Sequence, residues 1–146
     1  VRGDLAPVVG EYEARAGRYW KLDVIEVAAG ASSGQASASR VQESEGERIL
    51  ARIPGELEVV ALTRVGKTMG SRELAGYLEE HAVGSSPGVA FVIGGAFGLG
   101  ASVLKRARRK LSLSTFTLPH EMARLVLVEQ LYRAGTLVRG EPYHKA

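Results

Sequence analysis

Two short and almost wholly apolar runs constrain the fold of this chain more than any other feature. Residues 58–62 (EVVAL) and 88–93 (GVAFVI) lack the polar alternation of a strand with one wet face, and polar or turn-forming residues bound both runs. Such runs are typical of parallel strands that are buried on both faces. Because segments with helical spacing separate them, we predict an α/β fold with a mostly parallel sheet and helices on both faces.

The other elements are predicted from periodicity and from capping residues. Asp4 and Ser71 are placed to cap helices, and Pro119 suits the first turn of another. In chain order, the predicted elements are a helix from residue 4 to about residue 20, a strand at 21–27, a loop of small residues at 28–39, a helix at 41–53, the strand at 58–62, a helix at 71–81, the strand at 88–93, a glycine loop, a basic helix around 100–109, a strand at 110–114 and a helix at 120–134.

The last predicted helix is apolar around much of its circumference. Its apolar residues are Met122, Leu125, Val126, Leu127, Val128 and Leu131, and they do not fall on a single face. We therefore expect the helix to be covered on two sides, by the sheet and by a partner subunit. Gly135 is expected to end the helix, and a tail then follows from Thr136.

Composition excludes several classes of protein. The 146 residues suit one domain, which we assign to residues 1–146. With no cysteine and three histidines, the chain has no disulfide, thiolate metal site or cysteine nucleophile, and we expect no metal site. No apolar run is long enough to cross a bilayer and no leader peptide appears, which predicts a cytoplasmic protein. The start at Val1, directly on a helical pattern, is consistent with a native N-terminal strand that is missing.

Positive charge is concentrated in the last third of the chain. Residues 1–100 hold 10 basic and 13 acidic side chains, net −3, whereas residues 101–146 hold 9 and 3, net +6. The densest run is Lys105, Arg106, Arg108, Arg109 and Lys110. Such a run favours a polyanion partner, because binding to phosphates releases their condensed counterions. A solvated helix face is the alternative interpretation, and the run alone does not decide between them.

Two nucleotide-binding motifs are incomplete. The sequence Gly66-Lys67-Thr68 resembles the end of a P-loop, but Ala61 stands where that motif needs its first glycine. Lys67 is therefore expected to be an ordinary loop lysine. The glycine loop at 94–100 follows a predicted strand, but Ile93 stands where a dinucleotide fingerprint needs a glycine. The loop is either a tight turn or a place where a ligand approaches the backbone closely.

Three separated blocks of sequence resemble the RlmH family of the SPOUT superfamily. They are FVIGGAFGL (91–99), LSLSTFTLPHEMARLVLVEQLYRA (111–134) and RGEPYHK (139–145), with weaker similarity at 18–27, 45–50 and 61–67. The family consists of methyltransferases that act on N3 of a pseudouridine in helix 69 of 23S ribosomal RNA in assembled ribosomes. The resemblance implies an α/β trefoil knot, an exception to the rule that chains are unknotted, and a homodimer.

The resemblance also implies an S-adenosylmethionine site formed by three loops that follow the strands ending at Leu62, Ile93 and Ser114. The positions that match the family's cofactor site are Leu62, Gly94, Leu113, Ser114, Thr115, Phe116, Thr117 and Leu118. The residue types suit a small cofactor, because leucines can enclose an adenine while glycine and backbone groups meet its polar edge.

The family's C-terminal tail implies candidate residues for RNA binding and catalysis. Arg139 and Lys145 are expected to hold RNA phosphates, Tyr143 to stack on a base, and His144 to accept or shuttle a proton. Arg139, Tyr143 and His144 are therefore the candidate catalytic residues, and one subunit's tail would complete the site of the other. His120, at a helix N-terminus, is expected to be neutral and structural.

Two other functions remain open at this point. A non-enzymatic RNA-binding or ribosome-binding protein on the same scaffold would explain the basic last third of the chain equally well. A nucleotide-dependent oxidoreductase would rest on the glycine loop alone, against its spacing. The three hypotheses differ in the cofactor that the chain should bind. The methyltransferase would bind S-adenosylmethionine, the RNA-binding or ribosome-binding protein would bind none, and the oxidoreductase would bind a dinucleotide.

Overall fold

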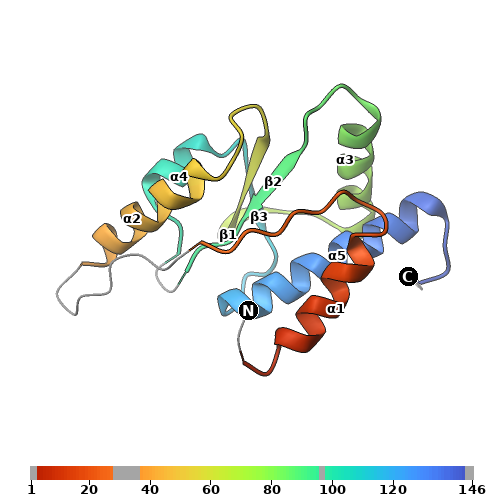
Figure 1. Ribbon diagram of the computed structural model, residues 1–146, viewed down its shortest axis with the longest axis horizontal. Coiled ribbons are helices and arrows are strands. Elements are labelled where there is room, and N and C mark those ends of the chain that lie inside the picture. Colours follow the sequence, from red (N-terminus) through yellow and green to blue (C-terminus); the bar gives the residue numbers. More distant parts are fainter. Residues whose placement is uncertain (1–2, 28–36, 96–97, 144–146) are drawn as a thin grey trace. The chain divides into compact units, whose positions relative to one another are not determined.

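A computed structural model describes residues 3–27, 37–95 and 98–143, and within these ranges the chain forms two compact units. One unit, here called the helical unit, comprises residues 1–23, 69–86 and 121–146. The other, here called the sheet unit, comprises residues 24–68 and 87–120. Figure 1 shows the elements of each unit along the chain.

The sheet unit is built on three parallel strands in the order β2-β1-β3. The central strand β1 spans Glu58–Thr68, with β2 (Val89–Val92) on one side and β3 (Arg109–Ser112) on the other. Both apolar runs form strands because a parallel strand with two covered faces favours branched apolar side chains. The predicted α/β class with a parallel sheet is confirmed.

Two helices, α2 (Ala38–Ala51) and α4 (Ala101–Arg106), pack together in the sheet unit (Figure 1). The apolar core there consists of Val59, Val92 and Val103, and Ile49, Leu50 and Ile53 from the α2 region pack against it. The Ser37 hydroxyl accepts a hydrogen bond from the Arg40 N–H and caps α2. Residues 37–39, predicted as part of a loop, therefore begin a helix, and the rest of that loop, 28–36, lies outside the described residues.

The helical unit contains α1 (Ala6–Ala16), α3 (Ser71–Val83) and α5 (His120–Arg139). Tyr132 of α5 has its ring 6.1 Å from that of Tyr12 and 5.8 Å from that of Tyr19. The Trp20 indole N–H donates to the carbonyl oxygen of Leu131, and the Arg124 guanidinium forms a 2.7 Å ion pair with Glu13. These contacts join the segment around α1 to α5.

Helix boundaries differ from the prediction at several places, and two of the predicted N-cap residues are not caps. The first helix ends at Ala16, before Trp20, and Leu5 rather than Asp4 is its N-cap residue. Gly70 is the N-cap of α3, and the hydroxyl of Ser71 donates instead to Gln130 Oε1 at 2.6 Å. A tertiary partner therefore replaces the local capping role predicted for Ser71.

The predicted strand at 21–27 is wrong. No described segment pairs with it, and its backbone has no regular secondary structure. Val24 and Ile25 are 43% and 41% exposed. A strand needs a neighbour for its N–H and C=O groups, and the described residues supply none here.

The last helix is longer than predicted. Gly135 lies inside α5, which continues to Arg139, and Gly140 follows with a φ of +68°. A Cβ added to Gly135 would lie 2.5 Å from the Tyr19 Cβ, so the glycine allows close packing of α5 on that segment. The glycine therefore serves packing inside the helix, and the residue with left-handed backbone lies five positions later.

The central strand also runs past its predicted end at Leu62. Leu62 and Lys67 both pair with Leu111 of β3, so the residues between them form an irregularity in the strand before Thr68 pairs with Ser112. Lys67 is thus a strand residue and not the loop lysine predicted. The other two strands end at Val92 and Ser112, one and two residues before the predicted ends.

Candidate functional site

Three segments of the sheet unit lie at the carboxyl-terminal edge of the sheet. They are the second half of β1, the glycine turn after β2, defined here as Gly94–Gly98, and the segment 113–118 after β3. Parallel strands place their carboxyl ends at one edge, and this is where α/β proteins bind ligands. The predicted cofactor residues are therefore brought to a common edge of one unit.

The glycine turn is closed by its own backbone. The Gly98 N–H donates to the Gly95 carbonyl oxygen at 3.0 Å, and Gly98 has a φ of +77°, which favours glycine. A Cβ on Gly94 would lie 2.6 Å from the carbonyl carbon of Gly98. Gly94 must therefore be glycine for the turn to close, whether or not a ligand is bound. Residues 96 and 97 lie outside the described residues.

Hydrogen bonds within the unit fix the segment after β3. The Ser112 hydroxyl is buried and lies 3.1 Å from the Arg64 carbonyl oxygen and 3.0 Å from that of Ser114. The Phe116 N–H donates to the Ser114 hydroxyl at 2.9 Å, and the Arg64 guanidinium donates to the Thr117 hydroxyl at 3.2 Å. Thr117 and the polar groups of Ser114 thus already have partners that hold the segment in shape.

The apolar candidates divide into two groups. Leu62, Leu113 and Leu118 are half-buried, which leaves each of them apolar surface to offer a ligand. Phe116 is 80% exposed, and so it does not enclose anything within this chain. Thr115 is also exposed.

Two further side chains, those of Arg64 and Val65, lie in the irregular part of β1. A Cβ on Gly66 would lie 2.6 Å from the Lys110 carbonyl carbon and oxygen, so the strand passes directly against β3 at this point. Val65 is 84% exposed, and Arg64 carries the bond to Thr117. Sequence reasoning missed Arg64, since nothing in the local pattern indicated that β1 would continue beyond Leu62.

Most of the basic run has structural partners. The Arg106 guanidinium donates to the carbonyl oxygens of Gly55 and Leu57 at 2.9 and 3.0 Å. Arg108 and Arg109 both pair with Glu58, at 3.5 and 3.3 Å. Lys105 and Lys110 are exposed. The hydrogen bonds of Arg106 favour a structural role for that residue. The Arg108 and Arg109 side chains are 77% and 51% exposed, so the run stays compatible with a polyanion partner.

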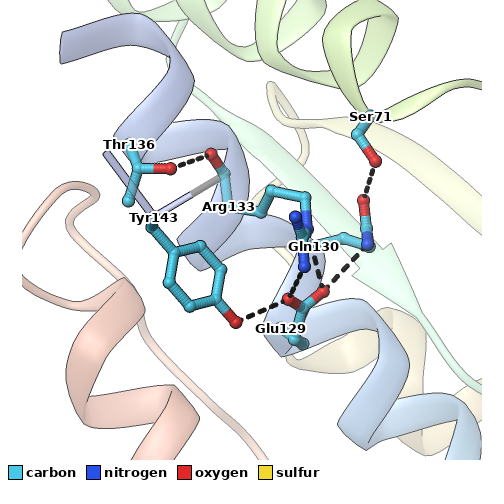
Figure 2. A network of polar contacts seen from close by, with 6 residues as sticks. All are labelled: Ser71, Glu129, Gln130, Arg133, Thr136 and Tyr143. Carbon is cyan, nitrogen blue, oxygen red and sulfur yellow. Dashed lines mark hydrogen bonds and ion pairs between the residues drawn. The ribbon is translucent and has the colours of Figure 1, made fainter. Parts of the chain in front are cut away.

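A second group of candidates lies in the helical unit, on α5 and just after it (Figure 2). Glu129 is at its centre: its Oε2 accepts from the Arg133 guanidinium at 2.6 Å and from the Tyr143 hydroxyl at 2.8 Å. Its Oε1 accepts from the Gln130 amide at 2.8 Å, and Gln130 in turn accepts from Ser71. Thr136, also drawn, donates to the Arg133 carbonyl oxygen.

The Tyr143 ring, like its hydroxyl, has close neighbours in the helical unit. It lies 4.5 Å from the Tyr132 ring, and the Arg133 guanidinium carbon lies 5.0 Å from its centre. Burial raises the pKa of Tyr143 well above its ordinary value, and hydrogen bonds with Tyr12 and Glu129 raise this pKa further. In this structure the Tyr143 ring therefore makes an edge-to-face contact within its own chain.

Arg139 occupies a different place from the one predicted. It is the last residue of α5 rather than part of a tail, and its guanidinium carbon lies 4.8 Å from the centre of the Tyr19 ring. Tyr19 donates to Glu141 at 3.1 Å, and burial and this bond raise the Tyr19 pKa. His144 and Lys145 lie outside the described residues.

Sequence reasoning left the partners on the last helix unassigned. Arg124 pairs with Glu13, and Arg133 with Glu129, so all four side chains have partners within the helical unit. The available signal was Glu129 itself, a carboxylate set among apolar residues, which calls for a partner. His120 is exposed at the first position of α5.

A metal-binding group and a membrane-spanning helix are both absent from the part of the chain that the structure describes. No group of three or more histidines or carboxylates there is arranged to hold a metal ion. Among the same residues, no helix is long and apolar enough to cross a membrane.

Comparison with known proteins defines the class. A sequence model of the family described as predicted SPOUT methyltransferase matches residues 2–144, and the chain belongs to this methyltransferase family. A relative from Gemmatimonas aurantiaca, named ribosomal RNA large subunit methyltransferase H, is 54% identical over 97% of this chain and 90% of its own length. Relatives of the same name from Clostridium beijerinckii and Listeria monocytogenes are 41% and 46% identical, over 97% and 94% of this chain and 91% and 88% of their own lengths. The resemblance to the RlmH family is confirmed.

Proposed function

We propose that this protein transfers a methyl group from S-adenosylmethionine to N3 of a pseudouridine in helix 69 of 23S ribosomal RNA, in assembled ribosomes. The observation that carries the proposal is that the glycine turn and the segment 113–118 both follow parallel strands that flank β1, at the same edge of one sheet, in a chain of the SPOUT methyltransferase family. The relatives' name, ribosomal RNA large subunit methyltransferase H, supports the choice of substrate.

The residues at this edge fit the proposed cofactor. Half-buried Leu62, Leu113 and Leu118 offer apolar surface for an adenine ring, and Gly94 allows the glycine turn to close at the same sheet edge. When bound, S-adenosylmethionine supplies an activated methyl group on a sulfonium sulfur. The backbone at Ser114 to Thr117 would set the orientation of the cofactor, since its own hydrogen bonds make that segment rigid.

The protein's part in the reaction is alignment and removal of one proton. As the N3–methyl bond forms, the bond from carbon to sulfur breaks, its electron pair stays on sulfur, and the N3 proton leaves. We assign His144 as the group that accepts or shuttles this proton, Tyr143 and Arg139 as further catalytic residues, and Lys145 as a contact to an RNA phosphate. Tyr143 would have to leave its contacts with Tyr132 and Glu129 to stack on a base.

The proposed working form is a homodimer with a trefoil knot in each subunit. The tail after α5 of one subunit would complete the cofactor site of the other, and the apolar surface of α5 would be covered by the partner. Met122 and Val138 on α5, 37% and 38% exposed, support this proposal. We place the protein in the cytoplasm, with the ribosomes.

The test is methyl transfer from labelled S-adenosylmethionine to ribosomes that lack the modification. We expect about one methyl group per ribosome, located on N3 of one pseudouridine by mass spectrometry, and much less transfer to isolated large subunits or to protein-free RNA. Gly94→Val, whose side chain would collide with the Gly98 backbone, serves as the inactive control. Transfer to no ribosomal substrate, or to a different nucleotide, would refute the proposal.

A further inference from the structure

The glycine turn rests on a carboxylate that the proposed reaction does not use. Glu45 projects from α2, and its Oε2 and Oε1 would lie 2.6 and 3.1 Å from a Cβ added to Gly95. The carboxylate thus occupies the space that a side chain at position 95 would take. Glycine at 95 lets this charge lie directly against the backbone of the turn.

One oxygen of this carboxylate lacks a partner within the described structure. Glu45 Oε1 is buried from solvent, and among the described residues no group donates a hydrogen bond to it. A buried carboxylate oxygen without a donor is unfavourable, and it leaves negative charge that is poorly compensated. Buried groups of this kind in native proteins call for an explanation.

Close packing between α2 and the neighbouring segments keeps Glu45 in this position. A Cβ on Gly46 would lie 2.9 Å from the Ser102 hydroxyl of α4, and one on Gly100 would lie 3.0 Å from the Gln42 carbonyl oxygen. Two glycines therefore allow α2 to pack closely against α4 and its N-cap residue, Gly100. Because α2 packs closely at Gln42 and at Gly46, on either side of Glu45, the Glu45 side chain is kept against Gly95.

We propose that the Glu45 carboxylate makes the glycine turn selective for a positively charged cofactor over its neutral product. This inference rests on the proposed function, which places S-adenosylmethionine at the turn. The sulfonium sulfur of that molecule is positively charged, and it becomes a neutral thioether when the methyl group leaves. Because one oxygen of the carboxylate is buried from solvent, part of its field acts through the low dielectric of the protein and is weakly screened by salt. Glu45 is a positioning and selectivity residue that acts through the turn.

The experiment compares three forms of the full chain, the natural sequence, Glu45→Gln and Glu47→Gln, by calorimetric titration with S-adenosylmethionine and with S-adenosylhomocysteine. Glu45→Gln keeps the size of the side chain and removes its charge. Glu47 is exposed on the same helix, so Glu47→Gln makes the same change in net charge away from the turn. We expect Glu45→Gln to weaken S-adenosylmethionine binding about tenfold and S-adenosylhomocysteine binding about twofold or less, and Glu47→Gln to alter neither.

Equal weakening of both ligands by Glu45→Gln would overturn the inference, because shape or hydrogen bonding would then explain the effect. Unchanged binding of both would overturn it as well. Glu45→Asp, which keeps the charge on a shorter side chain, should keep the preference for S-adenosylmethionine even if its overall affinity falls. If the natural chain binds neither ligand, the proposed function fails instead, so the two failures are distinguishable.

Discussion

At the scale of single residues, Tyr143 gives the clearest pH-dependent prediction. Its pKa is raised in the folded chain, first by burial and then by hydrogen bonds, above the value of 10.0 for a free tyrosine. The folded state therefore binds this proton more tightly than the unfolded state does. The associated stability is fully present below pH 10 and is lost as the pH rises through the folded pKa.

We expect the Tyr143→Phe variant to lose less folding stability at alkaline pH than the natural chain. At neutral pH the variant should be less stable by about 1 kcal/mol, because the hydrogen bonds of Tyr143 with Glu129 and Tyr12 are gone while those from Arg133 and Gln130 to Glu129 remain. Above pH 10 the difference between the two proteins should shrink. Chemical unfolding at a series of pH values measures it, and a difference that grows with pH would contradict the assignment.

The site residues could be predicted from sequence where a contiguous motif carried them. Gly94 and Leu113 to Leu118 lie in blocks whose order and spacing resemble the family, and the fold brings them to one sheet edge. Glu45 could not be assigned, because its importance depends on a turn that only the folded structure forms. For Glu129 the sequence offered the signal of a carboxylate among apolar residues, but it did not indicate Tyr143, 14 positions away, as a partner. A single acidic residue on a charged helix, such as Glu45, carries no such information locally.

At the scale of elements, α5 depends on Gly135. Gly135→Ala would add helix propensity, but its Cβ would collide with Tyr19, and overpacking of this kind costs about 1 to 3 kcal/mol. We expect a net loss of about 1 to 2 kcal/mol in the free energy of unfolding. The matched control is Gly76→Ala in α3, where nothing lies within 4 Å of the added Cβ.

The control should stabilise the chain by up to about 1 kcal/mol, because alanine is the better helix former. Thermal or denaturant unfolding of both variants gives the comparison. If Gly135→Ala were as stable as Gly76→Ala, the close contact of α5 with Tyr19 would be absent in solution.

The basic helix α4 gives a second prediction at this scale. Arg106→Ala removes two hydrogen bonds to the carbonyl oxygens of Gly55 and Leu57, so we expect a loss of about 1 to 3 kcal/mol in stability. Lys105→Ala, at an exposed neighbouring position, should change stability by less than about 0.5 kcal/mol. Denaturant titration measures both, and equal effects would contradict a structural role for Arg106.

Elements were predictable where local pattern and tertiary environment agree. The runs at 58–62 and 88–93 form strands because buried parallel strands need apolar residues at every position. The stretch at 21–27 has the same local preference, yet a strand exists only where another strand accepts its hydrogen bonds. The predicted end of α5 was wrong because local pattern and tertiary environment disagree at Gly135. Glycine often ends a helix, but Gly135 lies inside α5 and allows close packing against Tyr19.

At the scale of the whole molecule, the proposed dimer predicts complementation between inactive variants. Gly94→Val removes the cofactor site and His144→Ala removes the proposed proton acceptor. If a site combines one subunit's turn with the other's tail, mixed dimers regain one complete site each. Mixing equal amounts should restore roughly a quarter of the natural activity, given random pairing of subunits.

The measurement is methyl transfer before and after the two variants are mixed under conditions that allow subunits to exchange. Each variant alone should remain inactive, and sedimentation should confirm that both still form dimers. Activity that stays at the level of the separate variants would show that each site is built from a single subunit.

The position of β1 at the centre of the sheet also sets the order in which the sheet can assemble. Both described pairings involve β1, and β2 and β3 do not pair with each other. Among the three described strands, β1 is synthesised first, and its two neighbours follow in turn. Neither described pairing can therefore form until the segment between its two strands has been made and closes as a loop.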